Sequence, residues 1–380
     1  MRILMIAEFF TNFEDPVFSG GVETRVFYTA KHLAGDNKVI VLSRRRKKEK
    51  IYEKREGLEI FRLGRPVKSS VASAFSLLDR LMFVYQSSLK GLTIQADLVE
   101  GSNYVTFLQT YLVGVIKRIP KLAWYPDVLI GQWQKYFGIF LGFLGELGER
   151  VFLSLSWDQV ITISESAENK LIKNGVKPNK ITVISCGVEK SKFVKKPLKF
   201  KNPTLVVISR LLAYKQVDKV ISALNLLKKD FPEIKLVVIG EGPERKKLEK
   251  QILALGLKKS IKFYQQLPES KLIEILAKSQ TLVHPSIIEG FGIVLVEAAA
   301  VGTPFVAANI PTSASLAKKL NSGIIVKQKN SDKIAQAIKK LLKDNHFYLK
   351  KQKAGIINAK KFFWEKLTQE TKRVYEKILI

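Results

Sequence analysis

The chain has 380 residues with 46% hydrophobic content, and its 64 lysines and arginines against 34 aspartates and glutamates give a formal net charge of +30. This length predicts two domains, because single hydrophobic cores stop growing at about 250–300 residues. The one cysteine, Cys186, excludes an internal disulfide, and three widely separated histidines disfavour a histidine metal site. The excess of positive charge indicates an anionic partner, whether phosphate, anionic lipid or nucleic acid.

Strand-like and helical patterns alternate along the whole chain. In the first half the predicted strands are RILMIAEF (2–9), NKVIVLS (37–43), LEIFRLG (58–64), ADLVEGS (96–102), KLAWYPD (121–127), DQVITIS (158–164) and KITVISCG (180–187). In the second half they are TLVVIS (204–209), KLVVIG (235–240), SIKFYQ (260–265), TLVHPS (281–286), PFVAAN (304–309) and GIIVK (323–327). Buried strands that alternate with helices predict parallel sheets covered on both faces, and hence an α/β protein of two Rossmann-like domains facing each other across a cleft.

The alternation breaks once, in EKSKFVKKPLKFKNP (189–203), which has two prolines, many lysines and no apolar periodicity. We therefore predict a first domain over 1–190, a linker over 191–203 and a second domain over 204–360. The helical, aromatic-rich end of the chain predicts a helix over 361–380 that packs back on the first domain.

Three segments bear on membranes and anionic surfaces. The opening MRILMIAEFF is typical of a buried strand rather than of a secretory signal, and no stretch predicts a transmembrane helix, so we expect a cytoplasmic protein. The aromatic, leucine-rich run 136–157 is either an interior helix or a helix that docks on an anionic membrane surface. The basic run RRRKKEK (44–50) is either a solvated loop or a contact to the anionic partner.

The segment HPSIIEGFGIVLVEAAAVGTP (284–304) keeps two glutamates, Glu289 and Glu297, among apolar and small residues. It reads as a strand followed by a helix from Phe291 to Gly302, and a helix start beside glycines is a ready site for phosphate. Eight residues of helix advance about 12 Å, which is too far for an acid–base pair. The spacing instead suits a ligand with hydroxyls at both ends and phosphates between them, such as a nucleotide sugar. The alternative is structural: an acid at the helix start for Glu289 and a buried, ion-paired carboxylate for Glu297.

Cations and glycines follow other predicted strands. Arg210 directly follows a strand and Lys215 begins the next helix, so together they can neutralise a diphosphate. Gly240 and Gly242 read as simple turn residues. Gly20-Gly21 stands at a predicted helix start in the first domain and can present backbone N–H groups to a ligand.

These segments resemble the retaining GT-B glycosyltransferases of family 4. The resemblance rests on SGGVE (19–23), SRLLAYK (209–215), IGEGP (239–243) and above all PSIIEGFGIVLVEAAAVGTP (285–304), which has the spacing E-x7-E of that family. It implies that Glu289 binds the hydroxyls of the donor sugar and Glu297 those of the ribose, with Arg210 and Lys215 on the diphosphate. It further implies that phosphates are held by the backbone of Gly20, Gly21, Gly290, Phe291, Gly292 and Ile293. Family members bind the diphosphate without an obligatory metal, so no metal site and no cofactor are expected.

The sequence departs from the family pattern at several positions. No histidine follows a strand of the first domain where many relatives have one on the acceptor side, and Asp127 is the candidate substitute, with a simple Asx-turn as the alternative. Gln216, Gln265 and Cys186 also replace common residues, which leaves the base and the acceptor open.

The resemblance therefore implies a retaining, metal-independent glycosyltransferase. We expect a UDP- or GDP-sugar donor and a glycan or lipid-linked acceptor. Because a lipid-linked acceptor lies in the membrane, the expected location includes the cytoplasmic face of the membrane as well as the cytoplasm. No nucleic-acid partner is expected, because recognition aromatics, zinc spacing and arginine-rich repeats are missing from the sequence. Two alternatives stay open: a non-catalytic basic protein that binds membrane or nucleic acid, and a nucleotide-sugar epimerase on the same fold.

Overall fold

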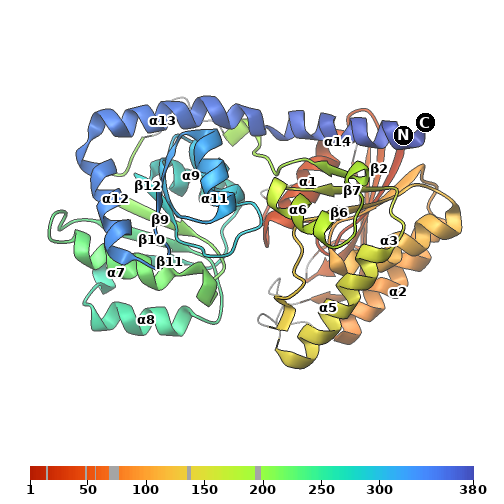
Figure 1. Ribbon diagram of the computed structural model, residues 1–380, viewed down its shortest axis with the longest axis horizontal. Coiled ribbons are helices and arrows are strands. Elements are labelled where there is room, and N and C mark those ends of the chain that lie inside the picture. The colour runs from red at the N-terminus through yellow and green to blue at the C-terminus, as the bar shows by residue number, and fades with distance from the viewer. Residues whose placement is uncertain (14–15, 48, 56, 68–76, 135–137, 193–197) are drawn as a thin grey trace. The chain divides into compact units, whose positions relative to one another are not determined.

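Figure 1 shows the computed structural model of the chain, which describes residues 1–13, 16–47, 49–55, 57–67, 77–134, 138–192 and 198–380. The chain forms two compact units. The first contains most of the residues up to Cys186 together with the C-terminal segment Trp364–Ile380, and the second consists mainly of Gly187–Phe363.

The first unit is built on an eight-stranded sheet of order β3-β4-β2-β1-β5-β6-β7-β8. Its strands are β1 (Arg2–Ile6), β2 (Lys38–Arg46), β3 (Tyr52–Arg55), β4 (Leu58–Val67), β5 (Leu98–Gly101), β6 (Lys121–Tyr125), β7 (Gln159–Thr162) and β8 (Ile181–Val183). Its helices are α1 (Gly21–Leu33), α2 (Leu77–Thr93), α3 (Tyr104–Lys117), α5 (Ile139–Ser154), α6 (Glu165–Lys173) and α14 (Trp364–Leu379). The neighbouring strands are parallel except for the antiparallel pair β3 and β4.

The second unit is a fully parallel six-stranded sheet of order β11-β10-β9-β12-β13-β14. Its strands are β9 (Thr204–Ile208), β10 (Lys235–Ile239), β11 (Ile261–Tyr264), β12 (Thr281–His284), β13 (Phe305–Ala308) and β14 (Gly323–Val326). Its helices are α7 (Val217–Leu227), α8 (Arg245–Ala254), α9 (Glu269–Lys278), α10 (Ile293–Ala300), α11 (Pro311–Leu320), α12 (Ser331–Lys343) and α13 (Asn345–Ala359). This strand order is that of the dinucleotide-binding Rossmann fold.

Every predicted strand forms, and two parallel-sheet units confirm the predicted α/β class. The strands were readable because helices cover both faces of a parallel sheet, so the central strands are continuous apolar runs. Strand β3 was not predicted; its residues Tyr52–Arg55 are polar and largely exposed. That strand is held by antiparallel pairing with β4 rather than by burial, and so it carries no apolar signal.

Two arginines of the basic run 44–50 differ from both interpretations given to the run, while Lys47 and Lys50 are exposed. Strand β2 continues to Arg46, and residue 48 lies outside the described residues. Arg44 is buried and pairs with Glu8 at 3.4 Å, and Arg46 pairs with Glu23 at 2.7 Å. These arginines are therefore neither a solvated loop nor open to a partner, because carboxylates of the same unit already neutralise them.

Part of the predicted linker is fixed to the second unit, while residues 193–197 lie outside the described residues. The Lys199 ammonium donates to the carbonyls of Ala277 and Ser279, each at 2.8 Å, and to Thr303 Oγ1 at 3.0 Å. Burial lowers the pKa of Lys199 to about 7. The carbonyls of Ala277 and Ser279 stand at the C-terminal end of α9, so Lys199 satisfies acceptors that the helix leaves without an internal donor.

The run 136–157 forms α5, and the interpretation of it as an interior helix is wrong; residues 136 and 137 lie outside the described residues. Ile139 and Phe140 are 83% and 74% exposed, and most of the other large apolar residues of α5 are exposed too. Within the part of the chain that the structure describes, we find no helix with the length and apolar character needed to span a bilayer.

A buried polar cluster ties α14 into the first unit. The Arg25 guanidinium of α1 pairs with Glu100 of β5, and the Tyr375 hydroxyl of α14 donates to Glu100 Oε2 at 2.6 Å. All three side chains are buried. A buried ion pair is stable only when its remaining lone pairs are satisfied, and Tyr375 satisfies one of them.

We predict that Tyr375→Phe loosens α14. The change leaves a lone pair of buried Glu100 unsatisfied, which costs about 1–3 kcal/mol and should speed amide hydrogen exchange in 364–379 by roughly 5- to 150-fold. Tyr85→Phe, on the exposed face of α2, serves as the control and should leave exchange unchanged. Equal protection of α14 in wild type and Tyr375→Phe would contradict the stabilising role of this hydrogen bond.

Candidate functional site

The second unit has a switch point in its strand order between β9 and β12. From β9 the chain builds β10 and β11 on one side and then crosses to β12 on the other side. Ligands of open α/β sheets bind beyond the carboxyl ends of the strands at such a point. The turn after β9 carries Arg210 and Lys215, and the turn after β12 carries Glu289. The Ile287 N–H donates to the Tyr214 carbonyl at 3.0 Å, which joins the two turns.

Three ionisable side chains meet between these turns. Lys215 Nζ donates to Glu289 Oε2 at 2.6 Å, and His284 Nε2 lies 3.1 Å from the same oxygen. Lys215 and His284 are buried, and Glu289 is partly buried. The structure thus brings together Lys215 and Glu289, both predicted as site residues, and adds His284, which the sequence analysis did not assign to the site.

Opposing effects act on the Glu289 carboxyl. Burial alone would raise its pKa, but the Lys215 ammonium and the hydrogen bond and charge of His284 lower the pKa of Glu289 well below its ordinary value. Glu289 is therefore a carboxylate at neutral pH. A fixed carboxylate can accept hydrogen bonds from hydroxyl groups, and the ammonium beside it can neutralise a phosphate.

The predicted helix after β12 begins two residues later than expected. Gly292 is its N-cap in the left-handed conformation, with φ of 86°, and α10 starts at Ile293 rather than at Phe291. Glu289 and Gly290 lie in the preceding turn, so the helical spacing of about 12 Å does not apply to the two glutamates. Glu297 lies in the second turn of α10 and is partly buried.

The turn after β10 packs on the turn after β9 through backbone atoms. A Cβ added to Gly240 would lie 1.9 Å from the Ser209 carbonyl oxygen, and one added to Gly242 would lie 2.3 Å from that of Leu211. The two glycines are therefore needed for close packing, which refines their interpretation as simple turn residues. Arg210 is exposed, and its Nη2 donates to the Tyr214 hydroxyl at 3.2 Å.

The first unit has its own switch point at β1, which lies between β2 and β5. Helix α1 starts at Gly21 after the N-cap Gly20, and an added Cβ on either glycine would meet no atom within 4 Å. Glu23 Oε2 accepts from the backbone N–H of Ser19 at 2.9 Å, from its hydroxyl at 2.7 Å and from Arg46 at 2.7 Å. Glu23 and Arg46 thus fix the glycine turn, and sequence reasoning assigned neither to it.

Asp127 follows β6 in the first unit. Its Oδ1 accepts from Lys170 Nζ at 2.7 Å and from the Val128 N–H at 2.9 Å, and its carbonyl accepts from the Tyr104 hydroxyl. Nearby, buried Glu149 holds the same loop by accepting from Leu129 N–H at 3.0 Å. Asp127 is therefore ion-paired and well fixed, and its assignment to the acceptor side stays a prediction.

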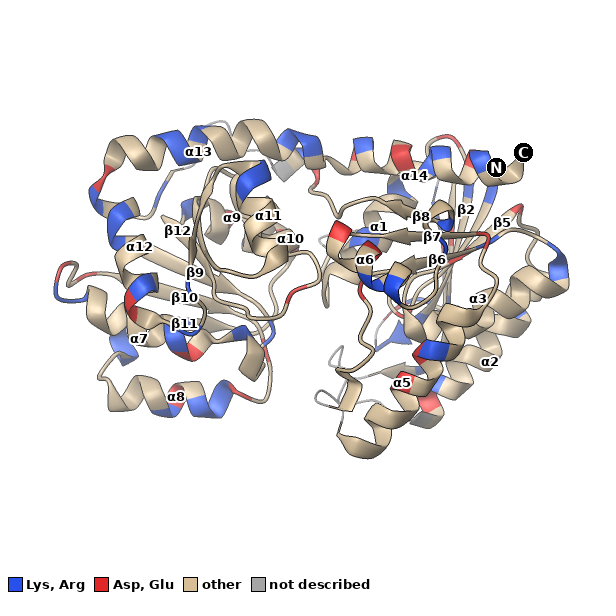
Figure 2. Cartoon of the chain, in the orientation of Figure 1, with Lys and Arg blue, Asp and Glu red and all other residues tan. Residues whose placement is uncertain are grey.

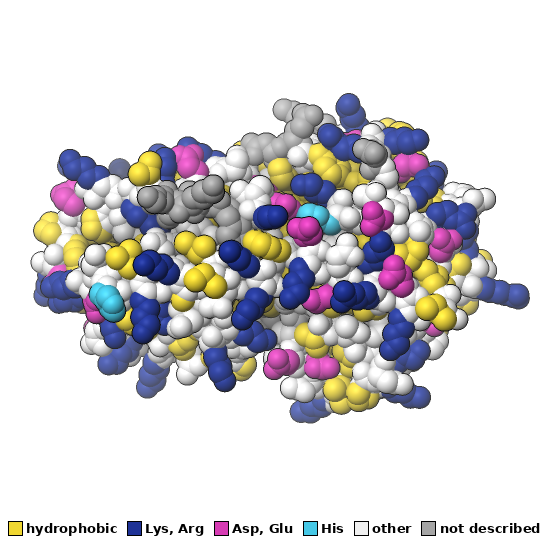
Figure 3. Space-filling model, turned by 90° about the horizontal axis from the view of Figure 1, so that it is seen from above, with side chains coloured by type: hydrophobic (Ala, Val, Ile, Leu, Met, Phe, Trp, Pro, Cys, Tyr) yellow, Lys and Arg dark blue, Asp and Glu magenta, His cyan; other side chains and the backbone are white. Residues whose placement is uncertain are grey.

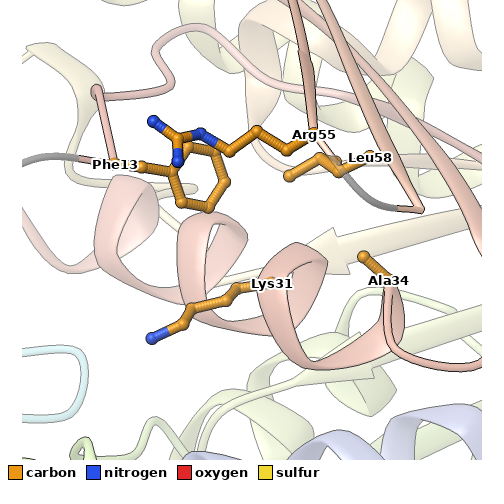
Figure 4. Close-up of a pocket in the computed structure, with 5 residues that line it drawn as sticks. All are labelled: Phe13, Lys31, Ala34, Arg55 and Leu58. Atoms are coloured by element: carbon orange, nitrogen blue, oxygen red, sulfur yellow. The ribbon is translucent and has the colours of Figure 1, made fainter.

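A surface cavity of about 440 Å³ lies elsewhere in the first unit, between α1 and the β3–β4 hairpin. Figure 4 shows Phe13 beneath the Arg55 guanidinium, with Lys31, Ala34 and Leu58 as the other lining residues. The Arg55 guanidinium carbon lies 4.7 Å from the centroid of the Phe13 ring. None of the predicted site residues lines this cavity. As for metals, we find no group of three or more His, Cys, Asp or Glu that could ligate an ion within the described ranges.

Two parallel-sheet units are the architecture of the GT-B glycosyltransferases, and solved structures of that class share the fold of this chain. Sucrose-phosphate synthase from Thermosynechococcus elongatus matches with a TM-score of 0.80 and 19% identity over 99% of this chain and 98% of its own. HepE of Anabaena, in complex with UDP and glucose, matches with a TM-score of 0.77 and 19% identity over 99% of this chain and 100% of its own.

The chain belongs to the family 4 type of GT-B glycosyltransferases. Residues 188–362 match the family described as Glycosyl transferases group 1, and residues 19–192 match Glycosyltransferase Family 4. An uncharacterized glycosyltransferase of Methanocaldococcus jannaschii is 29% identical over 238 residues, 57% of this chain and 60% of the relative. Glycogen synthase of Mycobacterium tuberculosis is 27% identical over 61% of this chain and 58% of its own. The matches thus span about three fifths of these relatives.

We predict that Glu289 contributes to stability in a pH-dependent way. Its pKa is lower in the folded protein than the ordinary 4.5, so its ionisation stabilises the fold fully above that value. This contribution should decrease as the pH falls below 4.5, by at most about 1.4 kcal/mol per pH unit. Comparing melting temperatures of wild type and Glu289→Gln between pH 3.5 and 8 checks this. A difference that stays constant over this range would contradict the lowered pKa.

We also predict that Gly240→Ala disrupts the paired turns. Strain at positive φ costs about 1–2 kcal/mol, and the overlap with the Ser209 carbonyl adds about 1–3 kcal/mol. Gly256→Ala is the matched control, because Gly256 also has positive φ but an added Cβ would meet open space. Thermal unfolding should show the larger loss for Gly240→Ala, and equal losses would contradict the close packing.

Proposed function

We propose that this protein transfers a glycosyl group from a nucleoside diphosphate sugar to a hydroxyl of a glycan or lipid-linked acceptor, with retention of configuration and without a metal ion. The observation that carries the proposal is the meeting of Lys215, Glu289 and the start of α10 at the switch point of the second unit. An ammonium, a carboxylate and backbone N–H groups at a helix start match the charges and hydroxyls of such a donor.

Further observations support a nucleotide sugar as donor. The resembling HepE structures contain UDP, UDP with glucose, and UDP-glucose. Around the site, the buried polar atoms Ser209 Oγ, Gln216 Oε1 and Ser313 Oγ have no hydrogen-bond partner among the described residues. Buried polar atoms without partners are uncommon, and atoms of a bound donor could satisfy them.

The proposed roles are those implied by the resemblance to family 4, and the positions of the side chains are consistent with them. Lys215 and Arg210 neutralise the diphosphate, and the N–H groups from Gly290 to Ile293 hold its distal phosphate. Glu289 accepts hydrogen bonds from hydroxyls of the donor sugar, and Glu297 from those of the ribose. His284, bonded to the same oxygen as Lys215, fixes the orientation of the Glu289 carboxylate.

In the proposed reaction the bond between the anomeric carbon and the diphosphate oxygen breaks, and a bond to the acceptor oxygen forms on the same face of the sugar. The acceptor proton passes to the leaving diphosphate, so no protein nucleophile is required. Stabilisation of the leaving charge by fixed cations is then the main catalytic contribution of the protein. Family membership favours this reaction over epimerisation and over a purely binding role.

We predict that Lys215→Met lowers turnover by at least about 100-fold, because the leaving diphosphate loses its fixed cation. Release of the nucleoside diphosphate from a panel of UDP- and GDP-sugars, with and without acceptors, measures this. Lys219→Met is the matched control, since Lys219 lies one turn further on in α7 and pairs with Asp218. Turnover like that of wild type in Lys215→Met would refute the proposed site. The anomeric configuration of the product and the effect of EDTA test retention and metal independence separately.

A further inference from the structure

Helices α2 and α3 of the first unit are apolar on both sides. They pack along each other, α2 over β2 and β4 and α3 over β5 and β6, and bury one stripe against the sheet. Their outward side chains are also large and apolar: Leu78, Leu81, Met82, Tyr85 and Leu89 of α2, and Leu108, Leu112, Val115 and Ile116 of α3. A helix whose outer face meets water normally carries charged residues there, so these faces indicate another environment.

Helix α5 lies beside α3 and extends this surface (Figure 1). Its exposed apolar residues are Ile139, Phe140, Leu141, Phe143, Leu144, Leu147 and Val151. We call the exposed apolar residues of α2, α3 and α5 the three-helix surface. Large contiguous apolar patches on soluble domains mark sites of interaction with proteins or membranes.

Around the three-helix surface, the basic side chains are more exposed than the acidic ones. In Figure 2 the ribbons of α2, α3 and α5 are mostly tan. Of the acidic residues of α5, Glu149 is buried, while Glu146 is partly exposed and accepts from Arg150 at 2.8 Å and from Gly131 N–H at 3.2 Å. The cations Arg150 and Arg118, by contrast, are exposed. An apolar surface edged by exposed cations suits anionic lipid head groups above hydrocarbon.

Two partners could cover the three-helix surface, a lipid bilayer or a second copy of the chain, and the net charge favours the bilayer. Two copies would each bring +30, and their mutual repulsion opposes self-association. An anionic bilayer is instead attracted by that charge and can take up the aromatic and aliphatic side chains. We propose that the three-helix surface docks the protein on an anionic lipid bilayer. The link between docking and the acceptor rests on the proposed function, because a transferase docked in this way would meet its acceptor hydroxyl at the membrane.

The test is binding of the full chain to vesicles of phosphatidylcholine with 30% phosphatidylglycerol, measured by co-sedimentation. Phe140→Gln/Phe143→Gln/Leu147→Gln should lower the partition coefficient at least about tenfold, because three apolar side chains that would enter the bilayer are lost. The matched control is Leu226→Gln/Leu253→Gln/Ile357→Gln, which changes exposed apolar residues of the second unit and should bind like wild type. Rising salt should weaken binding of the wild type.

Other outcomes would overturn the docking surface. The first is that the α5 variant, Phe140→Gln/Phe143→Gln/Leu147→Gln, binds vesicles as strongly as the wild type. The second is that the matched control loses as much binding as the α5 variant. The third is that the wild type does not bind anionic vesicles at all. Wild-type binding by Leu81→Gln/Leu112→Gln/Ile116→Gln would exclude α2 and α3 from the surface. A dimer in sedimentation velocity that the α5 variant dissociates, without vesicle binding, would assign the surface to a second copy. Donor binding, followed by thermal shift with UDP, should stay unchanged in the α5 variant, so that failure of docking is distinguished from failure of the donor site.

Discussion

The ion pair between Lys215 and Glu289 is the interaction on which the site of the second unit depends. It joins the turn after β9 to the turn after β12 at the place where the strand order reverses. Two oppositely charged groups in contact satisfy each other while no ligand is bound, which lowers the cost of burying either. A diphosphate that takes over the ammonium would release the carboxylate for the hydroxyls of a sugar. One contact can thus keep both groups charged and correctly placed before the donor arrives.

The parallel sheets could be predicted because a strand that is buried on both faces consists of a continuous run of apolar residues. The same argument fails where structure does not depend on burial. Strand β3 is held by hydrogen bonds to β4, and the end of β2 is held by ion pairs of Arg44 and Arg46. Charged residues in a strand look like a loop in the sequence, because their carboxylate partners come from distant segments.

The site was predictable to the extent that its residues follow strands directly. Arg210, Lys215 and Glu289 could be assigned from their positions after strands and from the resemblance to a family. His284 ends β12 five residues before Glu289, and its position at the carboxyl end of a strand was a signal that could have found it. The start of α10 was placed too early, since Gly292 in the left-handed conformation delays the helix until Ile293. Only the backbone angle, not the composition, contains that information.

The basic residues behind the net charge of +30 act differently in different parts of the protein. Arginines at the end of β2 are neutralised inside the first unit, so they contribute little to its outer field. Lysines and arginines on the face seen in Figure 3 are dispersed among other side chains, which provides a diffuse attraction and no concentrated nucleic-acid patch there. Diffuse positive charge brings a protein toward an anionic surface, but it does not orient the molecule. Orientation requires a localised feature, and the exposed apolar faces of α2, α3 and α5 are such a feature. In the proposed docking, charge and apolar surface are complementary: the charge would raise the rate of encounter with an anionic bilayer, and the apolar surface would fix which side of the first unit meets the lipid.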